Sequence, residues 1–72
     1  MIKDYIIKIE YDSPEVYKVY FNELKPIKYY VYKNKNNFFE FCELDKQGRF
    51  INRNNTDFTL SQKEFLQLLR EG

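Results

Sequence analysis

Lysines and tyrosines alternate in two neighbouring segments of this 72-residue chain, and their spacing suits binding rather than catalysis. If residues 16–33 form a hairpin of two strands, the side chains at every second position point to the same face. Lysines on such a face can contact phosphates, and tyrosine rings between them can stack on unpaired bases. The face would present Lys18, Tyr20, Lys28, Tyr30 and Tyr32, followed by Lys33 and Lys35 at the next turn.

The charges of the chain are distributed unevenly, although the formal net charge is only +1. Residues 16–37 contain five lysines and one glutamate, a local charge of +4, whereas residues 1–15 carry −2 and residues 38–72 carry −1. A basic segment that coincides with outward tyrosines predicts an anionic partner such as single-stranded DNA or RNA. The alternative is an ordinary solvated sheet face, on which lysines discourage aggregation at the edges.

The residues that most enzymes use for catalysis are missing from the sequence. There is no histidine, which is the commonest general base and metal ligand. Cys42 lies in an apolar segment without a histidine to activate it, so we expect a buried structural thiol. Gly48 and Gly72 are the only glycines, which excludes a glycine-rich phosphate-binding loop. We therefore expect no enzymatic activity, no metal and no cofactor.

The length and the cysteine content predict a single domain, residues 1–72, in a reducing compartment. Cys42 is the only cysteine and we find no secretory signal, so we expect a cytoplasmic protein. No apolar run approaches the roughly 18 residues needed to span a membrane, so no membrane association is expected. A domain this short buries only about 60% of its unfolded surface, which favours oligomerisation as a source of stability.

The carboxy-terminal end of the chain gives the clearest local signal. Ser61 can cap a helix, and Glu64, three residues later, can reach back to the backbone amide of Ser61. Leu60 and Phe65 can then pack against each other across the cap. We therefore predict a short strand that leads through this cap into a helix at residues 62–71.

The predicted helix has a wide apolar side, which spans about 160° of its circumference at 100° per residue. A surface helix needs an apolar stripe of somewhat over 100°, so the excess could be a wide contact with the sheet or a contact with a second copy of the chain. We predict a homodimer formed through this side of the helix. The predicted interface residues are Phe65, Leu66 and Leu69.

Alternating apolar residues predict strands in the rest of the chain. The first strand would occupy residues 5–11, with Tyr5, Ile7, Ile9 and Tyr11 on one face. Further strands are predicted at residues 27–33, 38–44, 49–51 and 57–60. Turns are predicted at residues 22–26, 34–37 and 45–48, and a loop at residues 52–56.

The sequence allows two predictions for residues 15–22, a helix or a strand. Ser13, Pro14 and Glu15 are typical of a helix start, whereas the β-branched and aromatic residues that follow favour a strand, and we favour the strand. The predicted fold is therefore α+β, with an antiparallel meander of four or five strands followed by one carboxy-terminal helix packed on the sheet. Its predicted core consists of Phe65, Leu68, Leu69, Ile7, Ile9, Val31 and Phe41.

The second half of the chain resembles the positive cofactor four family of single-stranded DNA-binding transcriptional coactivators. The matching features are the turn at residues 45–48, the polar and basic loop at residues 49–55, and the strand, cap and helix from Phe58 to Leu69. The resemblance implies an antiparallel sheet followed by a helix, a dimer formed through the helices, and sheets that grip single strands. Arg49 and Arg53 in the basic loop therefore join the predicted nucleic-acid-binding residues.

Three functions remain open at this point. The first is a single-stranded DNA- or RNA-binding protein in transcription or in phage or mobile-element DNA metabolism. The second is a small phage or mobile-element module that binds a host protein and inhibits or modulates it, with tyrosines as the anchors of the interface. The third is a structural subunit of a larger assembly.

Overall fold

The computed structural model describes residues 2–51 and 56–71, and these residues form a five-stranded antiparallel sheet followed by one α-helix. The strands are adjacent in chain order, so the sheet is a meander. This confirms the predicted α+β fold. The elements are η1 (Ile2–Tyr5), β1 (Ile6–Ser13), β2 (Val16–Phe21), β3 (Ile27–Lys33), β4 (Phe39–Glu43), β5 (Phe58–Leu60) and α1 (Gln62–Glu71).

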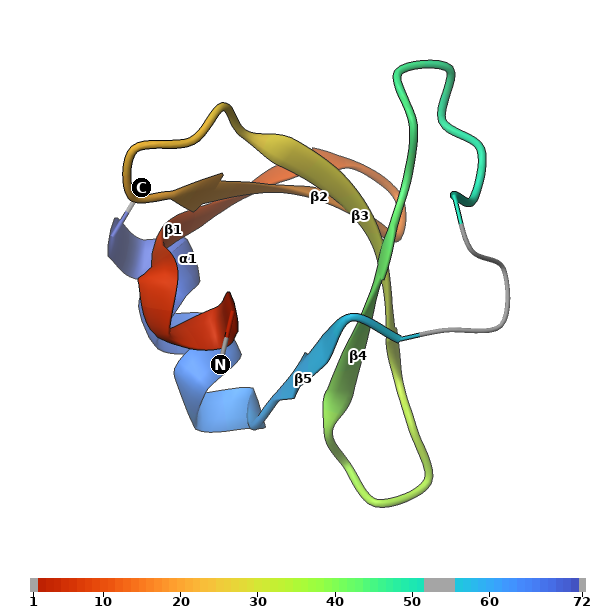
Figure 1. The fold of residues 1–72 in the computed structure, drawn as a ribbon. Coiled ribbons are helices and arrows are strands. Elements are labelled where there is room, and N and C mark those ends of the chain that lie inside the picture. The colour runs from red at the N-terminus through yellow and green to blue at the C-terminus, as the bar shows by residue number, and fades with distance from the viewer. Residues whose placement is uncertain (1, 52–55, 72) are drawn as a thin grey trace.

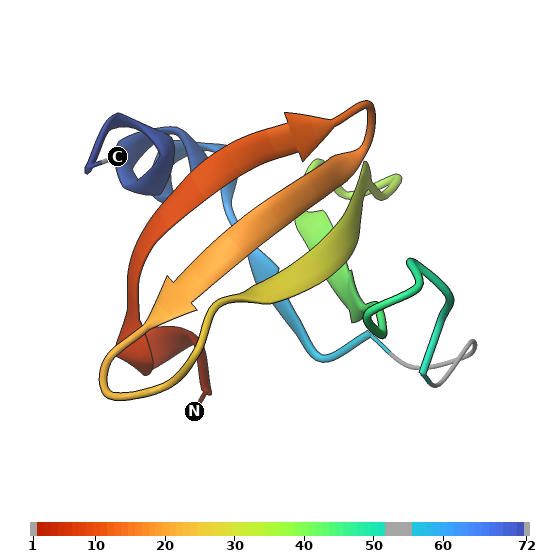
Figure 2. The same ribbon diagram turned by 90° about the horizontal axis from the view of Figure 1, so that it is seen from above.

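The sheet curls strongly, so that one face is turned inward and the other outward (Figures 1 and 2). We call these the inner face and the outer face. The helix α1 packs against β1 and contacts β5, and η1 also lies against β5. The two ends of the described chain therefore lie together at one side of the curled sheet, where they cover its inner face (Figure 1).

The inner face is filled by aromatic and aliphatic side chains. The ring of Tyr29 is fully buried and lies edge-on to Phe21, Phe41 and Phe58, at centroid distances of 6.4, 5.8 and 5.2 Å. Edge-to-face packing of this kind adds to the free energy gained by burial alone. The buried core cluster consists of Ile6, Ile9, Val19, Phe21, Tyr29, Val31, Phe41, Phe58, Leu60 and Phe65, with Leu68 and Leu69 packed against it.

The predicted burial pattern of β1 is wrong because the strand contains a bulge. Ile6 pairs with Phe21 and Lys8 pairs with Tyr20, so Ile7 is an extra residue in β1. A bulge resets the alternation of side chains, and Ile6 and Ile9 are both buried while Ile7 is 53% exposed. Tyr5 and Tyr11, which were predicted to share a strand face with Ile9, are also exposed, Tyr5 in η1 and Tyr11 at the rim of the inner face.

Residues 16–21 form the strand β2, and the alternative of a helix is wrong. Val19 and Phe21 point into the core, as expected for the strand. The predicted strand at residues 49–51 is wrong, since only a single bridge between Leu44 and Phe50 forms there. The turn before it is confirmed: the amide of Gly48 donates to the carbonyl of Asp45 (3.0 Å), and Gly48 has a φ of +82°.

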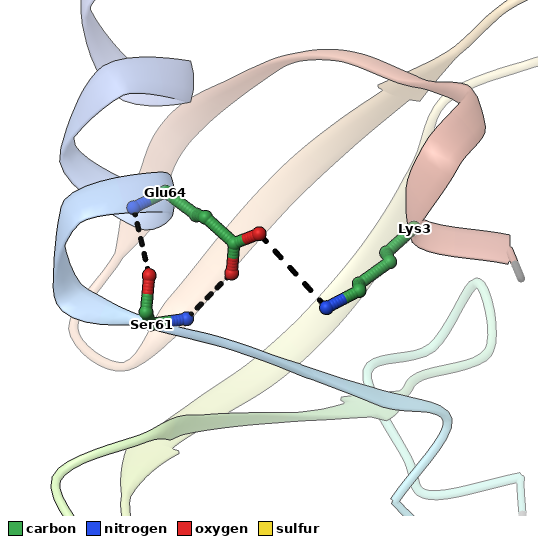
Figure 3. Close-up of polar contacts among 3 residues, drawn as sticks. All are labelled: Lys3, Ser61 and Glu64. Carbon is green, nitrogen blue, oxygen red and sulfur yellow. Dashed lines mark hydrogen bonds and ion pairs between the residues drawn. The ribbon is translucent and has the colours of Figure 1, made fainter.

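The cap at the start of α1 is confirmed (Figure 3). The hydroxyl of Ser61 accepts a hydrogen bond from the amide of Glu64 (3.2 Å), and the amide of Ser61 donates to the carboxylate of Glu64 (2.8 Å). The ammonium of Lys3 in η1 lies 3.9 Å from the same carboxylate, which ties the two ends of the described chain together. Leu60 and Phe65, on either side of the cap, are both buried in the core.

We predict that Ser61→Ala lowers the free energy of unfolding by about 1 kcal/mol, because the amide of Glu64 loses its acceptor. For a domain of this size the melting temperature should fall by about 4–8 °C. Thermal and urea unfolding would measure both. Ser61→Asp is the matched control, since aspartate also caps helices well and should leave the stability nearly unchanged. Equal stabilities of wild type and Ser61→Ala would mean that the cap contributes nothing.

Candidate binding face

The structure brings five of the predicted binding residues together on the outer face. Lys18 pairs with Lys28 across β2 and β3, and the tyrosines occupy neighbouring positions of the same strands. Their side chains point outward because Val19, Tyr29 and Val31, which alternate with them, are buried in the core. These outer-face residues are Lys18, Tyr20, Lys28, Tyr30 and Tyr32. Their role in binding stays a prediction.

The other predicted residues do not join this group. Lys33 pairs with Phe39 and its ammonium lies 5.7 Å from the centre of that ring, on the side of the inner face. Lys35 is exposed in the turn between β3 and β4. Arg49 is exposed in the hairpin after β4 and lies 3.7 Å from Asp45. Arg53 lies outside the described residues.

Each tyrosine of the outer face donates a hydrogen bond from its hydroxyl to a carboxylate. The negative charge of Glu15 raises the pKa of Tyr30, and the hydrogen bond to Glu40 raises the pKa of Tyr32. The bonds restrict the orientation of the rings before any partner arrives. The pairs are Tyr20 with Glu10 (3.1 Å), Tyr30 with Glu15 (3.2 Å) and Tyr32 with Glu40 (2.6 Å).

Glu40 collects three hydrogen bonds from different parts of the chain. Its carboxylate accepts from the hydroxyl of Tyr32, from the side-chain amide of Asn34 (2.9 Å) and from the hydroxyl of Thr56 (2.5 Å). The bond from Thr56, followed by those from Tyr32 and Asn34, lowers the pKa of Glu40. The carboxylate is therefore ionised at neutral pH, and it joins β3, β4 and the segment before β5.

The lysines of the outer face are balanced by carboxylates. The ammonium of Lys28 lies 3.7 Å from Asp12, and Lys18 pairs with Glu10 on its other side. The ammonium of Lys8 lies 4.5 Å above the ring of Tyr20. The sequence predicted a basic platform, but among the described residues of this face the three lysines stand beside four carboxylates, those of Glu10, Asp12, Glu15 and Glu40.

Three aromatic rings gather at one end of the outer face. The ring of Tyr30 lies 6.0 Å from that of Tyr32 and 5.5 Å from that of Phe50, which contacts it edge-on. Tyr32 and Phe50 are 38% and 46% exposed. We call Tyr30, Tyr32 and Phe50 the aromatic cluster. Sequence reasoning missed Phe50, because the bridge between Leu44 and Phe50 that brings it here depends on the path of the loop after β4.

Sequence reasoning also missed the carboxylates of Asp12, Glu15 and Glu40, although Glu40 had a detectable signal. A tight turn at residues 34–37 places Tyr32 opposite Glu40, as observed. Glu15 carries no such signal, because it reaches Tyr30 only through the pairing of β2 with β3.

A second pair of carboxylates lies on the side of the inner face. The buried hydroxyl of Tyr29 donates to Asp57 (3.2 Å), and Glu43 pairs with Tyr29 across β3 and β4. Partial burial and the nearby charge of Asp57 raise the pKa of Glu43. Glu40 and Glu43, three residues apart on β4, therefore have pKa values shifted in opposite directions.

The helix exposes one of the three residues predicted for a dimer interface. Phe65 is only 5% exposed and Leu69 packs against the core, so both contact their own chain. Leu66 is 44% exposed and lines an open hollow with Gln62, Lys63, Gln67 and Arg70. None of the described helices is both long and apolar enough to cross a membrane.

Comparison with protein-family models, with curated proteins and with solved structures found no match to this chain. The resemblance to the positive cofactor four family therefore stays a prediction.

We predict that Glu40→Gln lowers the free energy of unfolding at pH 7, on the order of 1 kcal/mol, because three donors lose a charged acceptor that is partly screened by solvent. The pKa of Glu40 is lowered in the folded protein, so its contribution is present above the ordinary pKa of 4.5 and is lost as the pH falls through the folded-state value. Urea unfolding of both proteins from pH 7 to pH 3 should show the difference shrinking below about pH 4.5.

Glu43→Gln is the matched control for Glu40→Gln, because the same change should act in the opposite direction. The folded-state pKa of Glu43 is raised, so its charged form opposes folding at neutral pH, and this cost disappears as the pH falls towards 4.5. The variant should be at least as stable as wild type at pH 7. A loss equal to that of Glu40→Gln would show that the charges of these residues do not determine the effects.

Proposed function

We propose that this chain is a small binding protein without catalytic activity and that it recognises another protein through the outer face. The observation that carries the proposal is the pairing of all three outer-face tyrosines with carboxylates, which orients their rings and places negative charges among the lysines of the face.

Oriented tyrosine rings suit protein recognition. Tyrosine is enriched among the residues that dominate interface energies, and a ring held in place before binding loses little conformational entropy on binding. Interfaces of this kind combine aromatic residues with a polar rim of both charge signs. The outer face has this composition, with Tyr20, Tyr30 and Tyr32 among Lys18, Lys28 and their carboxylate partners.

Single-stranded DNA or RNA is the second candidate, and one observation favours it. Lys18 and Lys28 lie directly opposite each other, and like charges in this position destabilise a sheet. A phosphate between them would relieve the repulsion, and Tyr30 could stack on a base. Against this, a polyanion on this face would meet the carboxylates of Glu10 and Glu40 at close range, which is unfavourable.

The setting of this function is also a proposal. The lysine-, asparagine- and tyrosine-rich composition supports a phage or mobile-element protein that inhibits or modulates a host protein. The single, buried Cys42 supports a reducing, cytoplasmic compartment.

We also propose that the chain forms a homodimer through the exposed side of α1. Leu66 is the exposed apolar residue at its centre, where it can pack against the same residue of a second copy. A small domain gains stability from such a contact because its own core is limited.

Selection of a random peptide library on the immobilised chain would test the outer face as a binding surface. We expect the selected peptides to perturb backbone amide signals of β2 and β3 in two-dimensional NMR spectra. Tyr20→Ala should lower the affinity of the selected peptides by about tenfold or more, which is the effect of removing an interface anchor. Tyr5→Ala is the matched control, because Tyr5 is an exposed tyrosine of η1 outside this face.

Peptides that perturb α1 instead, or that bind Tyr20→Ala as well as wild type, would contradict the proposal. Fluorescence anisotropy with labelled single-stranded and duplex oligonucleotides over a series of salt concentrations is the parallel measurement. Binding of single strands, with a log–log salt slope that drops by about 0.7 in Lys28→Ala, would establish the second candidate in its place.

We predict that Leu66→Glu abolishes self-association, because it places charges of the same sign at the centre of the proposed dimer contact. Sedimentation equilibrium at micromolar concentration should give about twice the chain mass of 8.9 kDa for wild type and the chain mass for the variant. Gln47→Glu adds the same charge in the exposed turn after β4, outside the proposed dimer contact, and controls for net charge. A wild type that sediments as a monomer would exclude the dimer.

A further inference from the structure

Tyr30 stands at the centre of the aromatic cluster, between two rings of different orientation. Tyr32 is tilted by 38° relative to Tyr30, whereas Phe50 stands at 75° to it. Two buried residues are the pairing partners of the cluster on the neighbouring backbone. Cys42 pairs with Tyr30, and Leu44 forms the bridge to Phe50. The cluster therefore lies against β3 and β4, while Tyr32 and Phe50 remain accessible to solvent.

The electrostatic character of the cluster is negative. The face of an aromatic ring attracts cations. The hydroxyls of Tyr30 and Tyr32 are bound to the carboxylates of Glu15 and Glu40, which place full negative charges at the edge of the cluster. Lys28, the neighbouring cation on β3, is directed to Asp12 and does not lie over these rings.

The same face contains a complete example of the site that the cluster forms in part. Tyr20 donates its hydroxyl to Glu10, and the ammonium of Lys8 lies 4.5 Å above its ring. Tyr32 with Glu40 repeats the pair of ring and carboxylate. Among residues 2–51 and 56–71, however, the cation–π contacts fall on Tyr20 and Phe39, so no described cation covers the cluster.

We propose that the aromatic cluster binds a positively charged side chain of the partner protein, an arginine in preference to a lysine. This inference rests on the proposed function and names the chemistry that the outer face recognises. A guanidinium group is planar and stacks on aromatic rings, and it can at the same time donate to Oε2 of Glu40, which has a lone pair left beside its bond from Asn34. An ammonium group can contact the same rings but cannot match that geometry.

The preference for a cation follows from where the charges lie. Glu15 and Glu40 attract a guanidinium group and repel a phosphate or a carboxylate brought to the same rings. Removal of the guanidinium from water strengthens its attraction to the ring faces, and the partial burial of Tyr30 between Tyr32 and Phe50 provides such a place.

Titration of the ¹⁵N-labelled full chain with the peptide acetyl-Gly-Arg-Gly-amide tests the inference. The citrulline analogue has nearly the same shape without the charge and serves as the neutral probe, and the lysine analogue tests the preference. We expect the arginine peptide to shift the amides of the cluster and to bind about fivefold more tightly than the citrulline peptide, as a cation–π contact predicts. The affinity of the lysine peptide should lie between those of the arginine and citrulline peptides.

Two variants examine the two parts of the site. Phe50→Leu should weaken binding of the arginine peptide severalfold, and Glu40→Gln should reduce the preference for the arginine over the citrulline peptide, since the rings and Glu15 remain. Tyr5→Leu and Glu23→Gln are the matched controls, an exposed tyrosine and an exposed glutamate outside the outer face, and should leave both affinities unchanged. Dispersed amide spectra would confirm that each variant is folded.

Equal binding of the arginine and citrulline peptides to wild type, or an unchanged preference in Glu40→Gln, would overturn the inference. These results would leave the proposed function intact if library peptides still bind the outer face through Tyr20. If library peptides bind elsewhere on the chain, the proposed function fails, whatever the arginine peptide does.

Discussion

The rest of the structure depends on one contact, the packing of Phe65 against the inner face of the sheet. Its ring lies 4.5 Å from that of Phe39, 5.1 Å from that of Tyr17 and 5.8 Å from that of Phe41. One side chain of α1 therefore covers residues from β2 and β4 and closes the core on the side where the helix packs. The cap at Ser61 fixes where α1 begins, so the position of Phe65 follows from two local hydrogen bonds.

A sheet with only one covered face must stabilise its other face without a core. The outer face does this with bonds between tyrosine hydroxyls and carboxylates and with lysines placed beside acidic residues. Exposed pairs of this kind contribute little to stability. Their larger effect is on order, because they hold aromatic rings in fixed positions on the surface that remains open to a partner. The demands of the fold and of the proposed binding role therefore fall on the same side chains.

The sequence predicted those features that depend on neighbours along the chain and missed those that depend on neighbours across strands. The cap, the extent of α1 and the strand at residues 27–33 are local, and all three are confirmed. The bulge at Ile7 could not be predicted, because it arises from how β1 pairs with β2. The lysines and tyrosines of the candidate face were placed correctly by alternation. Three of their four carboxylate partners were missed because charge was counted along the chain, where residues 16–37 are basic, whereas Asp12, Glu15 and Glu40 come from the adjoining segments.

Glu40 joins stability and the proposed recognition in a single group. Its carboxylate holds the hydroxyl of Thr56, which precedes β5, and thereby helps to fix the segment that leads into β5 and α1. The same carboxylate binds the hydroxyl of Tyr32 and provides the charge at the edge of the aromatic cluster. A cation bound there would remain close to a carboxylate whose own hydrogen bonds keep it ionised, so binding would require no change of protonation at neutral pH. The arrangement around Glu10, with Tyr20 bonded to it and Lys8 above the ring, gives the geometry that such a complex would reproduce between two chains.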